Sequence, residues 1–332
     1  MKPVATIKDI ARELGISPST VSRILNGLHQ GNKVLAEQVK ETAKRLNYQV
    51  NTAAKGLRTS KTRLIGLIVP DISDDFFASI LSGIEKKTEF HGYNLMICQS
   101  NESDEKEVEL IKSLLACNVE GILISPARGT KSLENLQIIK QAGKEAVVFD
   151  RPIEQEIFPS VNFADEEATY MAAKHLISQG HRRFLYLGMT LNLVNDKHRL
   201  EGYNKALKEA GLSGCDCLYV DQMHFTEQKL KDNWTTGQYD VVVCFNDIIA
   251  IRALSYFNDN DISVPQEVSL LGFDNRLVCD FTNPKLSSVE HSPRKMGEMA
   301  ALKLLEIIDN AEPEPLENKP ELVLRNTIRK IE

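Results

Sequence analysis

Apolar positions recur with helical spacing in three stretches near the start of the chain, at 7–14, 18–25 and 33–47. Each stretch has one apolar face and one polar face, so it predicts an amphipathic helix. Gly15 ends the first helix, where a left-handed residue is usual, and Ser17 stands where it can cap the second. Three short helices of this kind can share one small core.

The second predicted helix turns its apolar residues inward and presents small polar groups to solvent. Pro18 occupies its first position, where the missing N–H costs nothing. Short hydroxyls and one arginine face outward, namely Ser19, Thr20, Ser22 and Arg23. A helix–turn–helix places its second helix in the major groove of DNA, which suits this surface. A helical hairpin that only packs is the alternative, and the pattern alone does not decide between the two.

From residue 63 onward, short apolar runs alternate with amphipathic stretches. We predict buried strands at 64–69, 94–98, 121–125 and 146–149, then a second series at 161–163, 184–187, 218–220, 241–245 and 269–273, and a final strand at 322–325. Helices are predicted at 76–90, 105–117, 133–142, 166–179, 199–210, 226–234, 248–257 and 293–308. Two runs of βα units imply an α/β core of two doubly wound lobes.

The predicted strands end in polar residues. Open α/β sheets bind ligands beyond the carboxyl ends of their strands, so these side chains are candidates for one site. The polar side chains, together with Arg199 at the start of a predicted helix, can pair with sugar hydroxyls. The ring of Phe76 or Phe77 can cover the hydrophobic face of a sugar ring. The candidates are Phe76, Phe77, Ser125, Asp150, Arg151, Arg199, Asn246 and Asp274.

Most candidates also have a plainer structural explanation. Asp74 or Asp75 could simply cap the helix that follows the first strand, and Asn246 could cap a later one. One of the two adjacent phenylalanines could belong to the core. Asp150 and Arg151 could form an ion pair at the end of their strand. The pocket interpretation is favoured most for Arg199 and Asp274.

Charge is sorted along the chain. Residues 1–61 carry 11 lysines and arginines against 4 acidic residues, a net charge of +7, so the rest of the chain carries −13 and the whole chain −6. A basic segment on an acidic body is typical of a phosphate-binding module joined to a domain that does not bind nucleic acid. A merely solvated charged surface would not separate the signs by segment.

Composition and missing motifs exclude several classes of protein. A chain of 332 residues with 42% hydrophobic and 26% charged residues is ordinary for two or three globular domains. No apolar run approaches the roughly 18 residues of a membrane span, and the N-terminus lacks an apolar signal core, so we expect a cytoplasmic protein without a membrane partner. The sequence has no phosphate loop, zincin motif or nucleophile elbow, so we expect no enzyme, no metal and no cofactor.

The six cysteines form no CxxC pair. We expect buried thiols in a reducing compartment. A metal or redox pair at Cys215 and Cys217 is a weaker alternative.

The motifs near the N-terminus resemble those of the lac-repressor (LacI) family of bacterial transcription regulators. The matching segments are Ala5-Thr6-Ile7-Lys8-Asp9-Ile10-Ala11, Gly15-Ile16-Ser17, Thr20-Val21-Ser22-Arg23 and Asn26-Gly27. The resemblance continues to about Arg325. It implies a DNA-binding helix–turn–helix rather than a packing hairpin. It also implies a periplasmic-binding-protein-like core with an effector pocket between its lobes.

The resemblance divides the chain into three parts. They are a helix–turn–helix DNA-binding domain at 1–48, a hinge helix or linker at 49–61, and an effector-binding and dimerisation core at 62–332. Within the core we expect an N-lobe of about 62–161 and 292–320, and a C-lobe of about 162–291 and 321–332.

Residues expected to contact DNA lie in the head and in the hinge. Ser19, Thr20 and Arg23 are candidates for reading bases. The other expected contacts are Thr6, Ser17, Pro18, Ser22 and Asn26 in the head, and Ala54, Lys55, Leu57 and Arg58 in the hinge. Leu57 matches the family leucine that wedges into a central CG step from the minor groove and bends the duplex. Without DNA we expect a flexible linker, which folds on binding.

Three positions depart from the family pattern. Leu35-Ala36 replaces the usual Thr-Arg pair, so the resemblance does not carry all of the family's phosphate contacts over to this chain. In the hinge, the proline that most family members have near Val50 is missing. At 289–292, Val-Glu-His-Ser replaces Val-x-Gln-Pro. His291 therefore becomes a candidate titratable group beside the cleft or the crossover, with a plain surface histidine as the alternative.

These observations predict a sequence-specific DNA-binding transcription regulator, most simply a repressor, that responds to a small-molecule effector such as a sugar or sugar derivative. One recognition helix buries too little surface for tight binding, so we expect a homodimer on a near-palindromic double-stranded operator. The chain has no apolar heptad tail, which favours a dimer over a tetramer. A solute-binding protein and a sugar- or nucleotide-processing enzyme are the alternatives. A protein corepressor in place of the small molecule stays open.

Overall fold

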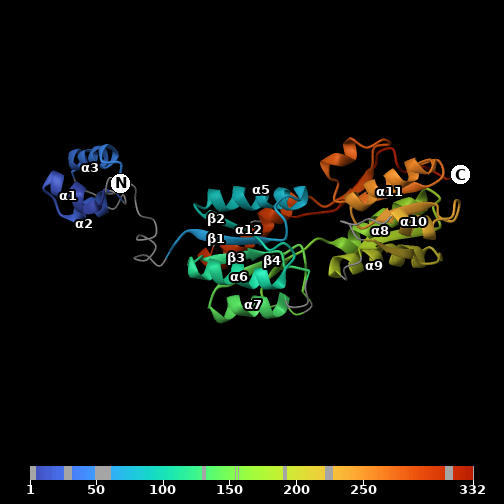
Figure 1. Cartoon of the computed structure of the whole chain (residues 1–332), viewed down its shortest axis with the longest axis horizontal. Coiled ribbons are helices and arrows are strands. Elements are labelled where there is room, and N and C mark those ends of the chain that lie inside the picture. The colour runs from blue at the N-terminus through green and yellow to red at the C-terminus, as the bar shows by residue number, and fades with distance from the viewer. Residues whose placement is uncertain are drawn as a thin grey trace. The chain divides into compact units, whose positions relative to one another are not determined.

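The computed structural model describes residues 5–25, 32–48, 61–128, 132–153, 155, 157–189, 193–220, 227–310 and 317–331. The chain forms two units, Met1–Thr62 and Arg63–Glu332, which we call the head and the core. Figure 1 shows the elements of each unit along the chain.

The described part of the head consists of three helices: α1 (Ile7–Leu14), α2 (Pro18–Leu25) and α3 (Lys33–Arg45). Their inward apolar side chains are buried in one cluster, as the helical spacing predicted. Gly15 ends α1 with φ +64, and the side chain of Asn32 caps α3 by accepting the backbone N–H of Val34 at 2.9 Å. The head is therefore a small three-helix body with its own core.

The N-lobe of the core is a five-stranded parallel sheet in the order β2-β1-β3-β4-β5. Its strands are β1 (Leu64–Val69), β2 (Asn94–Gln99), β3 (Gly121–Ile124), β4 (Glu145–Phe149) and β5 (Ser160–Val161). Its helices are α5 (Asp75–Phe90), α6 (Asp104–Ala116), α7 (Ser132–Gln141) and α12 (Pro293–Asp309). Leu67 packs towards α5 and α12, and Ile68 packs towards α6 and α7. Both faces are covered, which explains the continuous apolar run of β1.

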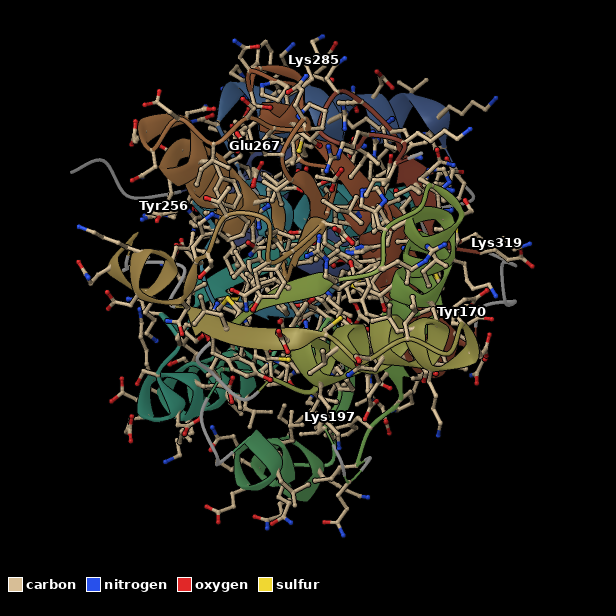
Figure 2. The ribbon with its side chains drawn as sticks, turned by 90° about the vertical axis from the view of Figure 1, so that its right-hand side faces the viewer. Tyr170, Lys197, Tyr256, Glu267, Lys285 and Lys319 are labelled. Atoms are coloured by element: carbon tan, nitrogen blue, oxygen red, sulfur yellow. The ribbon has the colours of Figure 1, made fainter. Side chains whose placement is uncertain are left out.

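The C-lobe is a six-stranded sheet in the order β11-β10-β9-β8-β6-β7, with only β11 antiparallel to its neighbour. Its strands are β6 (Phe184–Met189), β7 (Asp216–Val220), β8 (Val241–Cys244), β9 (Ser269–Phe273), β10 (Ser287–Glu290) and β11 (Glu321–Val323). Its helices are α8 (Asp165–Ser178), α9 (Val194–Glu209), α10 (Glu227–Asn233), α11 (Asp247–Asp259) and the 3-10 helix η1 (Leu277–Asp280). Exposed lysines such as Lys197, Lys285 and Lys319 project outward from this lobe (Figure 2).

Helix α12 returns the chain from the C-lobe to the N-lobe and packs along α5. The two helices approach so closely that a Cβ on Gly297 would collide with the carbonyl oxygen of Ile80. A Cβ on Gly83 would likewise collide with that of Arg294. Only glycine allows this backbone contact. The two helices therefore form one closely packed pair on a face of the N-lobe sheet.

The α/β core of two doubly wound lobes behind a three-helix head is confirmed, but one strand prediction is wrong and one strand was missed. The strand expected at 161–163 to open the second lobe is β5, which pairs with β4 and so belongs to the N-lobe. Strand β10 was not predicted, because its sequence Ser-Ser-Val-Glu has no apolar pattern. Ser287 and Ser288 are fully buried only because β9 and β11 flank them.

The prediction of buried thiols is wrong in part. All six cysteines are free, and Cys244 and Cys279 are buried, but Cys117 and Cys217 are exposed. Cys117 follows the last turn of α6, and Cys217 lies on β7 at the edge of its sheet. Among the described helices, none is long and apolar enough to cross a membrane.

Candidate DNA-binding surface and effector cleft

Helix α2 presents a polar outer face. The predicted DNA contacts at its start and along this face are all exposed or half-exposed: Ser17, Pro18, Ser19, Thr20, Ser22 and Arg23. The Oγ of Ser17 caps the helix by accepting the backbone N–H of Thr20 at 3.1 Å. The hydroxyls of Ser19 and Thr20 lie 2.7 and 2.8 Å from the same Oγ. A cluster of three hydroxyls thus marks the N-terminal end of α2, where a helix–turn–helix contacts base edges.

The remaining predicted DNA contacts are divided between the start of α1 and residues that the structure leaves undescribed. Thr6 is exposed, and its backbone N–H and hydroxyl both donate to the Oδ2 of Asp9, at 2.9 and 2.7 Å. Asp9 therefore supplies the acceptor at this helix end. Outside the described residues lie Asn26, Ala54, Lys55, Leu57 and Arg58.

In the core, residues from strand ends and helix starts of both lobes line one cleft. They are Asp74, Phe76, Phe77, Arg128, Asp150 and Arg151 from the N-lobe, and Leu193, Asn195, Arg199, Phe245, Asn246, Asp274 and Arg276 from the C-lobe. The cleft holds about 410 Å³ of space when its open mouth is counted, and its cavity volume is about 50 Å³. Of the predicted effector residues, Ser125 and His291 are not among those that line it.

Arg199 lies in the second turn of α9, which begins at Val194, so the prediction that it opens this helix is wrong. Its side chain is fixed within the C-lobe. It is 2% exposed, and its guanidinium carbon lies 3.7 Å from the ring centroid of Phe273 and 4.4 Å from that of Phe245. Its Nε donates to the Oδ1 of Asp165 at 2.7 Å, and its Nη1 donates to the carbonyl oxygen of Phe245. Nη1 also lies 3.9 Å from the Oδ1 of Asp274. Arg199 is therefore held in one orientation at the cleft wall.

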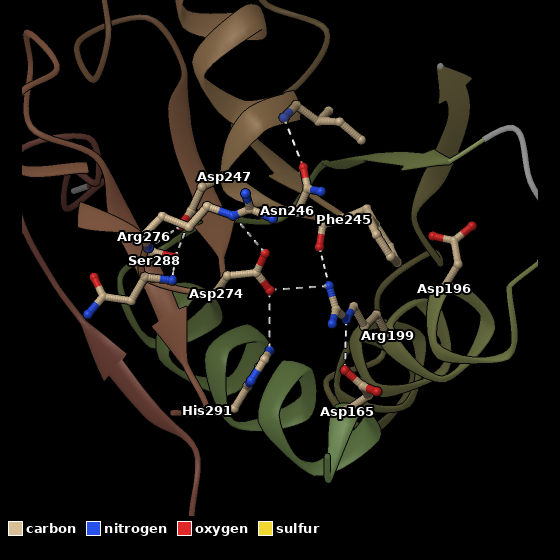
Figure 3. A network of polar contacts seen from close by, with 12 residues as sticks. Asp165, Asp196, Arg199, Phe245, Asn246, Asp247, Asp274, Arg276, Ser288 and His291 are labelled. Carbon is tan, nitrogen blue, oxygen red and sulfur yellow. Dashed lines mark hydrogen bonds and ion pairs between the residues drawn. The ribbon is translucent and has the colours of Figure 1, made fainter. Parts of the chain in front are cut away.

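Asp274 stands at the centre of the polar network in Figure 3. Its Oδ2 accepts from the Nε of Arg276 at 3.3 Å, and its Oδ1 lies 3.3 Å from the Nε2 of His291. Burial opposes ionisation, but the contacts from His291, Arg276 and Arg199 outweigh it and hold the pKa of Asp274 below its ordinary value. Asp274 is therefore an ionised hydrogen-bond acceptor at neutral pH.

His291 is 2% exposed, so the alternative of a surface histidine is wrong. Its ring centroid lies 3.5 Å from that of Phe163 and 4.7 Å from that of Phe273. This packing places the imidazole behind Asp274 rather than in the cleft. The geometry gives His291 the role of orienting a carboxylate.

Arg276, which sequence reasoning missed, links the two lobes. Its Nη1 donates to the Oδ1 atoms of Asp74 and Asp75 in the N-lobe, at 2.7 and 2.6 Å. In the C-lobe its Nε donates to Asp274, and its backbone N–H donates to the Oδ2 of Asp247 at 2.7 Å. The available signal was an arginine two residues beyond Asp274, at the same strand end.

Asp150 faces the cleft from the N-lobe. The Oγ of Ser125 donates to its Oδ2 at 3.3 Å, and the Nε of Arg151 lies 3.6 Å away. Burial raises the pKa of Asp150 to about 6 in spite of the nearby arginines. Asp150 and Asp274 both have left-handed backbones, with φ +69 and +102. Such strain costs roughly 1–3 kcal/mol per residue and is concentrated at functional sites.

Arg151 is paired mainly with a residue that was not predicted. It forms a bidentate ion pair with Glu102, at 2.8 and 2.9 Å, and donates to the carbonyl oxygen of Pro126 at 2.8 Å. Glu102 also lies 3.0 Å from the Nε of Arg128. The contact between Arg151 and Asp150 at the strand end is longer, so it is the weaker of the two pairings.

Several candidates serve the fold and also border the cleft. Asn246 caps α11 by accepting the backbone N–H of Ile249 at 3.0 Å, and Asp74 caps α5 by accepting that of Phe76 at 2.9 Å. Phe76 and Phe77 both belong to the buried N-lobe core, at 8% and 6% exposed. The structural and functional explanations therefore hold together for these residues.

Asn195 is a further cleft residue that sequence reasoning missed. It is 5% exposed, and its Oδ1 has no hydrogen-bond partner in the described part of the chain. A buried oxygen without a donor costs about 1–3 kcal/mol. Asn195 therefore offers the cleft an acceptor for a ligand hydroxyl.

Known proteins similar to this chain are regulators of transcription. Residues 6–51 match the model of bacterial regulatory proteins of the lacI family, and residues 173–328 match a periplasmic binding protein-like domain. The transcriptional regulator RegA of Clostridium saccharobutylicum is 30% identical over 92% of this chain and 93% of its own length. The transcriptional regulator GalR of Escherichia coli strain K12 is 30% identical over 98% of this chain and 96% of its own.

Two solved structures share the fold along nearly the whole chain. The lac repressor dimer bound to operator and the anti-inducer ONPF superposes with a TM-score of 0.86 at 22% identity, covering 98% of this chain and 100% of that one. The transcriptional regulator CelR in complex with cellobiose superposes with a TM-score of 0.70 at 24% identity, covering 97% and 99%.

Proposed function

Since the chain belongs to the lacI family of bacterial regulatory proteins and is a DNA-binding transcription regulator, we propose that it is a repressor that binds a near-palindromic operator as a homodimer. In this proposal a sugar or sugar derivative in the cleft switches it. The repressor acts in the cytoplasm, where its operator lies, and carries no enzymatic activity. The family match and the two relatives at 30% identity confirm the resemblance to the lac-repressor family. The observation that carries the effector proposal is the pair Asp150 and Asp274, which face one cleft from two lobes.

The head supports the operator proposal through its charge and its exposed groups. Residues 1–61 carry a net charge of +7, and α2 presents Arg23 beside a cluster of hydroxyls. In the proposed complex Ser19, Thr20 and Arg23 read bases. Leu57 enters the minor groove at the operator centre, where an apolar wedge unstacks a base step and bends DNA.

An exposed apolar surface supports a second copy of the chain as partner. At η1, Leu277, Val278 and Phe281 are 73%, 37% and 77% exposed. Neighbouring exposed apolar side chains of this size mark interaction surfaces. A near-palindromic operator requires two heads related by two-fold symmetry, so the second copy is the partner that covers this surface.

The chemistry of the cleft supports a sugar as effector. Carboxylates at Asp150 and Asp274 and the unpaired amide oxygen of Asn195 can accept hydrogen bonds from hydroxyls, and Phe76 or Phe77 can cover an apolar ring face. Ligands in solved relatives of similar fold include cellobiose, which is bound to CelR.

Arg276 gives such a ligand a means of changing the DNA-binding state. Its ion pairs with Asp74 and Asp75 hold the lobes at one relative angle. A ligand that bridges Asp150 and Asp274 favours the angle at which both can be reached. It shifts the equilibrium only by binding one state more tightly than the other. In a dimer this angle sets the spacing of the two hinges, and with it the affinity for the operator.

The operator proposal is tested by letting the full-length protein select duplexes from a randomised library. We expect a near-palindromic consensus. We also expect an affinity that falls steeply with salt, with a slope of log K against log salt of about −0.9 for each phosphate neutralised. A protein that selects no consensus contradicts the proposal.

The effector proposal is tested by a thermal-shift screen of sugars, sugar acids, sugar phosphates and purines. A ligand at 100 times its Kd stabilises the protein by about 2.7 kcal/mol, which raises the unfolding midpoint. A true effector should also change the affinity for the operator. The same ligand should no longer raise the unfolding midpoint of the Asp150→Asn variant. A ligand that shifts both proteins equally binds outside the cleft. A screen in which no sugar or sugar derivative binds would falsify the sugar assignment.

A further inference from the structure

The first residue of the core has an unusual backbone conformation. Arg63 precedes β1 and has φ +54, in a left-handed region that residues other than glycine rarely adopt. It lies just beyond the predicted hinge at 49–61, so it marks the point where the hinge meets the core. A residue stays in such a conformation only where the contacts around it fix it.

Three side chains from other segments of the N-lobe converge on Arg63. Its backbone N–H donates to the Oε1 of Glu120 at 2.5 Å, and its Nη1 donates to the Oδ2 of Asp309 at 2.9 Å. Its guanidinium lies over the ring of Tyr93, 4.8 Å from the centroid. The Tyr93 hydroxyl lies 3.1 Å from the Oε2 of Glu120 and 2.8 Å from the Oδ2 of Asp309. We call this cluster the Arg63 clamp.

Helix α12 connects the clamp with the effector cleft. Asp309 is its last residue, and its first residue, Pro293, follows closely on His291, which contacts Asp274 at 3.3 Å. The 17 residues of α12 span about 25 Å. Glycines bring α12 and α5 into direct backbone contact, which opposes sliding of one helix against the other.

We propose that Tyr93, Glu120 and Asp309 are positioning residues for operator recognition. By fixing Arg63 they set the direction in which the hinge leaves the core, and α12 makes that direction depend on the state of the cleft. The inference rests on the proposed dimeric binding, because two hinges must leave at a fixed separation for two heads to meet two half-sites. A loosened clamp leaves each head able to bind DNA but lets the separation vary.

Two clamp variants and one matched control separate this role from a general loss of structure. Tyr93→Phe removes the bridging hydroxyl without changing charge, and Asp309→Asn removes one negative charge. The control is Glu298→Gln, which removes the same charge from the same helix. Glu298 pairs with Lys86 of α5 at 2.9 Å, and its loss alters none of the clamp contacts described above.

The full-length proteins are compared on three duplexes: the selected operator, the same operator with one base pair inserted at its centre, and a random sequence. Unfolding midpoints are measured in parallel. Wild type and Glu298→Gln should prefer the selected spacing by the same factor. Tyr93→Phe and Asp309→Asn should reduce that factor about fivefold, the effect of one hydrogen bond. On the random duplex, Tyr93→Phe should bind with the affinity of wild type, because its charge is unchanged. Asp309→Asn should bind with the affinity of Glu298→Gln, because both lack one negative charge.

An unchanged spacing preference in Tyr93→Phe overturns the inference, and so does an equal loss in Glu298→Gln. If Asp309→Asn unfolds the core, Tyr93→Phe alone decides. A wild-type protein that prefers no operator at all refutes the dimeric function instead, so the two failures can be told apart.

Discussion

Replacement of Asp150 by asparagine should stabilise the core while removing an effector contact. Asparagine tolerates the left-handed backbone of this position, φ +69, better than most residues do. Its amide oxygen can still accept from Ser125. What the substitution removes is a negative charge at a residue that is only 5% exposed.

The magnitude follows from the pKa of this carboxyl. Burial raises it from the ordinary 3.8 to about 6 in the folded core. At about 1.36 kcal/mol per pKa unit, the ionised form of Asp150 costs the folded state about 3 kcal/mol at neutral pH. Folding takes up a proton between these two pKa values, so the wild-type protein loses stability as pH rises from about 4 to about 6. The advantage of the variant should be absent near pH 4 and complete near pH 7.

Thermal unfolding of the full-length protein over a pH series measures this difference. For a unit of this size, about 1 kcal/mol corresponds to about 2 °C, so Asp150→Asn should unfold about 6 °C higher at neutral pH. Ser125→Ala keeps the charge and removes a donor to it, so this control should show no gain. A gain that does not depend on pH, or a loss of stability at neutral pH, would refute the reasoning.

Three further substitutions test other parts of the structure. Gly297→Ala should cost about 1–3 kcal/mol or more in urea unfolding, because its Cβ would collide with the carbonyl oxygen of Ile80; an unchanged midpoint would show that α5 and α12 can separate. Arg276→Gln removes the cation that links the lobes, so the radius of gyration from small-angle scattering should increase; an identical radius would contradict the linking role. Arg23→Gln should weaken operator binding. If Arg23 reads a base, the substitution should relax specificity at one base pair, and if it neutralises a phosphate, the salt slope should fall by about 0.9. If neither change is observed, Arg23 does not contact the DNA.

The sequence alone was enough to predict the cleft residues that lie at the carboxyl ends of parallel strands. Asp150 and Asp274 directly follow β4 and β9, and Asn246 lies two residues beyond β8. Parallel strands bring their carboxyl ends to one edge, so the convergence of these residues could be predicted. Glu102 and Asn195 could not be found in this way. Asn195 reaches the cleft from the start of α9, and Glu102 reaches the cleft residue Arg151 from the loop between β2 and α6. The paths of both segments depend on packing between parts of the chain that are far apart in the sequence.

The errors in the fold arise from short strands, which carry little information of their own. Strand β5 has two residues, and nothing in Ser160–Val161 indicates which sheet it joins. Strand β10 is polar in sequence and buried only by its neighbours. His291 shows the same limit, because its burial depends on two phenylalanines from other segments, Phe163 and Phe273.

The two lobes are built from separated stretches of chain, so neither can be completed early during synthesis. The N-lobe lacks part of its packing until α12 has emerged to join α5, and the C-lobe sheet is incomplete until β11 pairs with β10. The head, in contrast, lies within the first 62 residues and can fold while the ribosome is still translating the core. A growing chain therefore carries a DNA-binding head long before it has a partner surface or an effector cleft. Ribosomes that stop before α12 should release fragments that bind DNA weakly and neither repress nor respond.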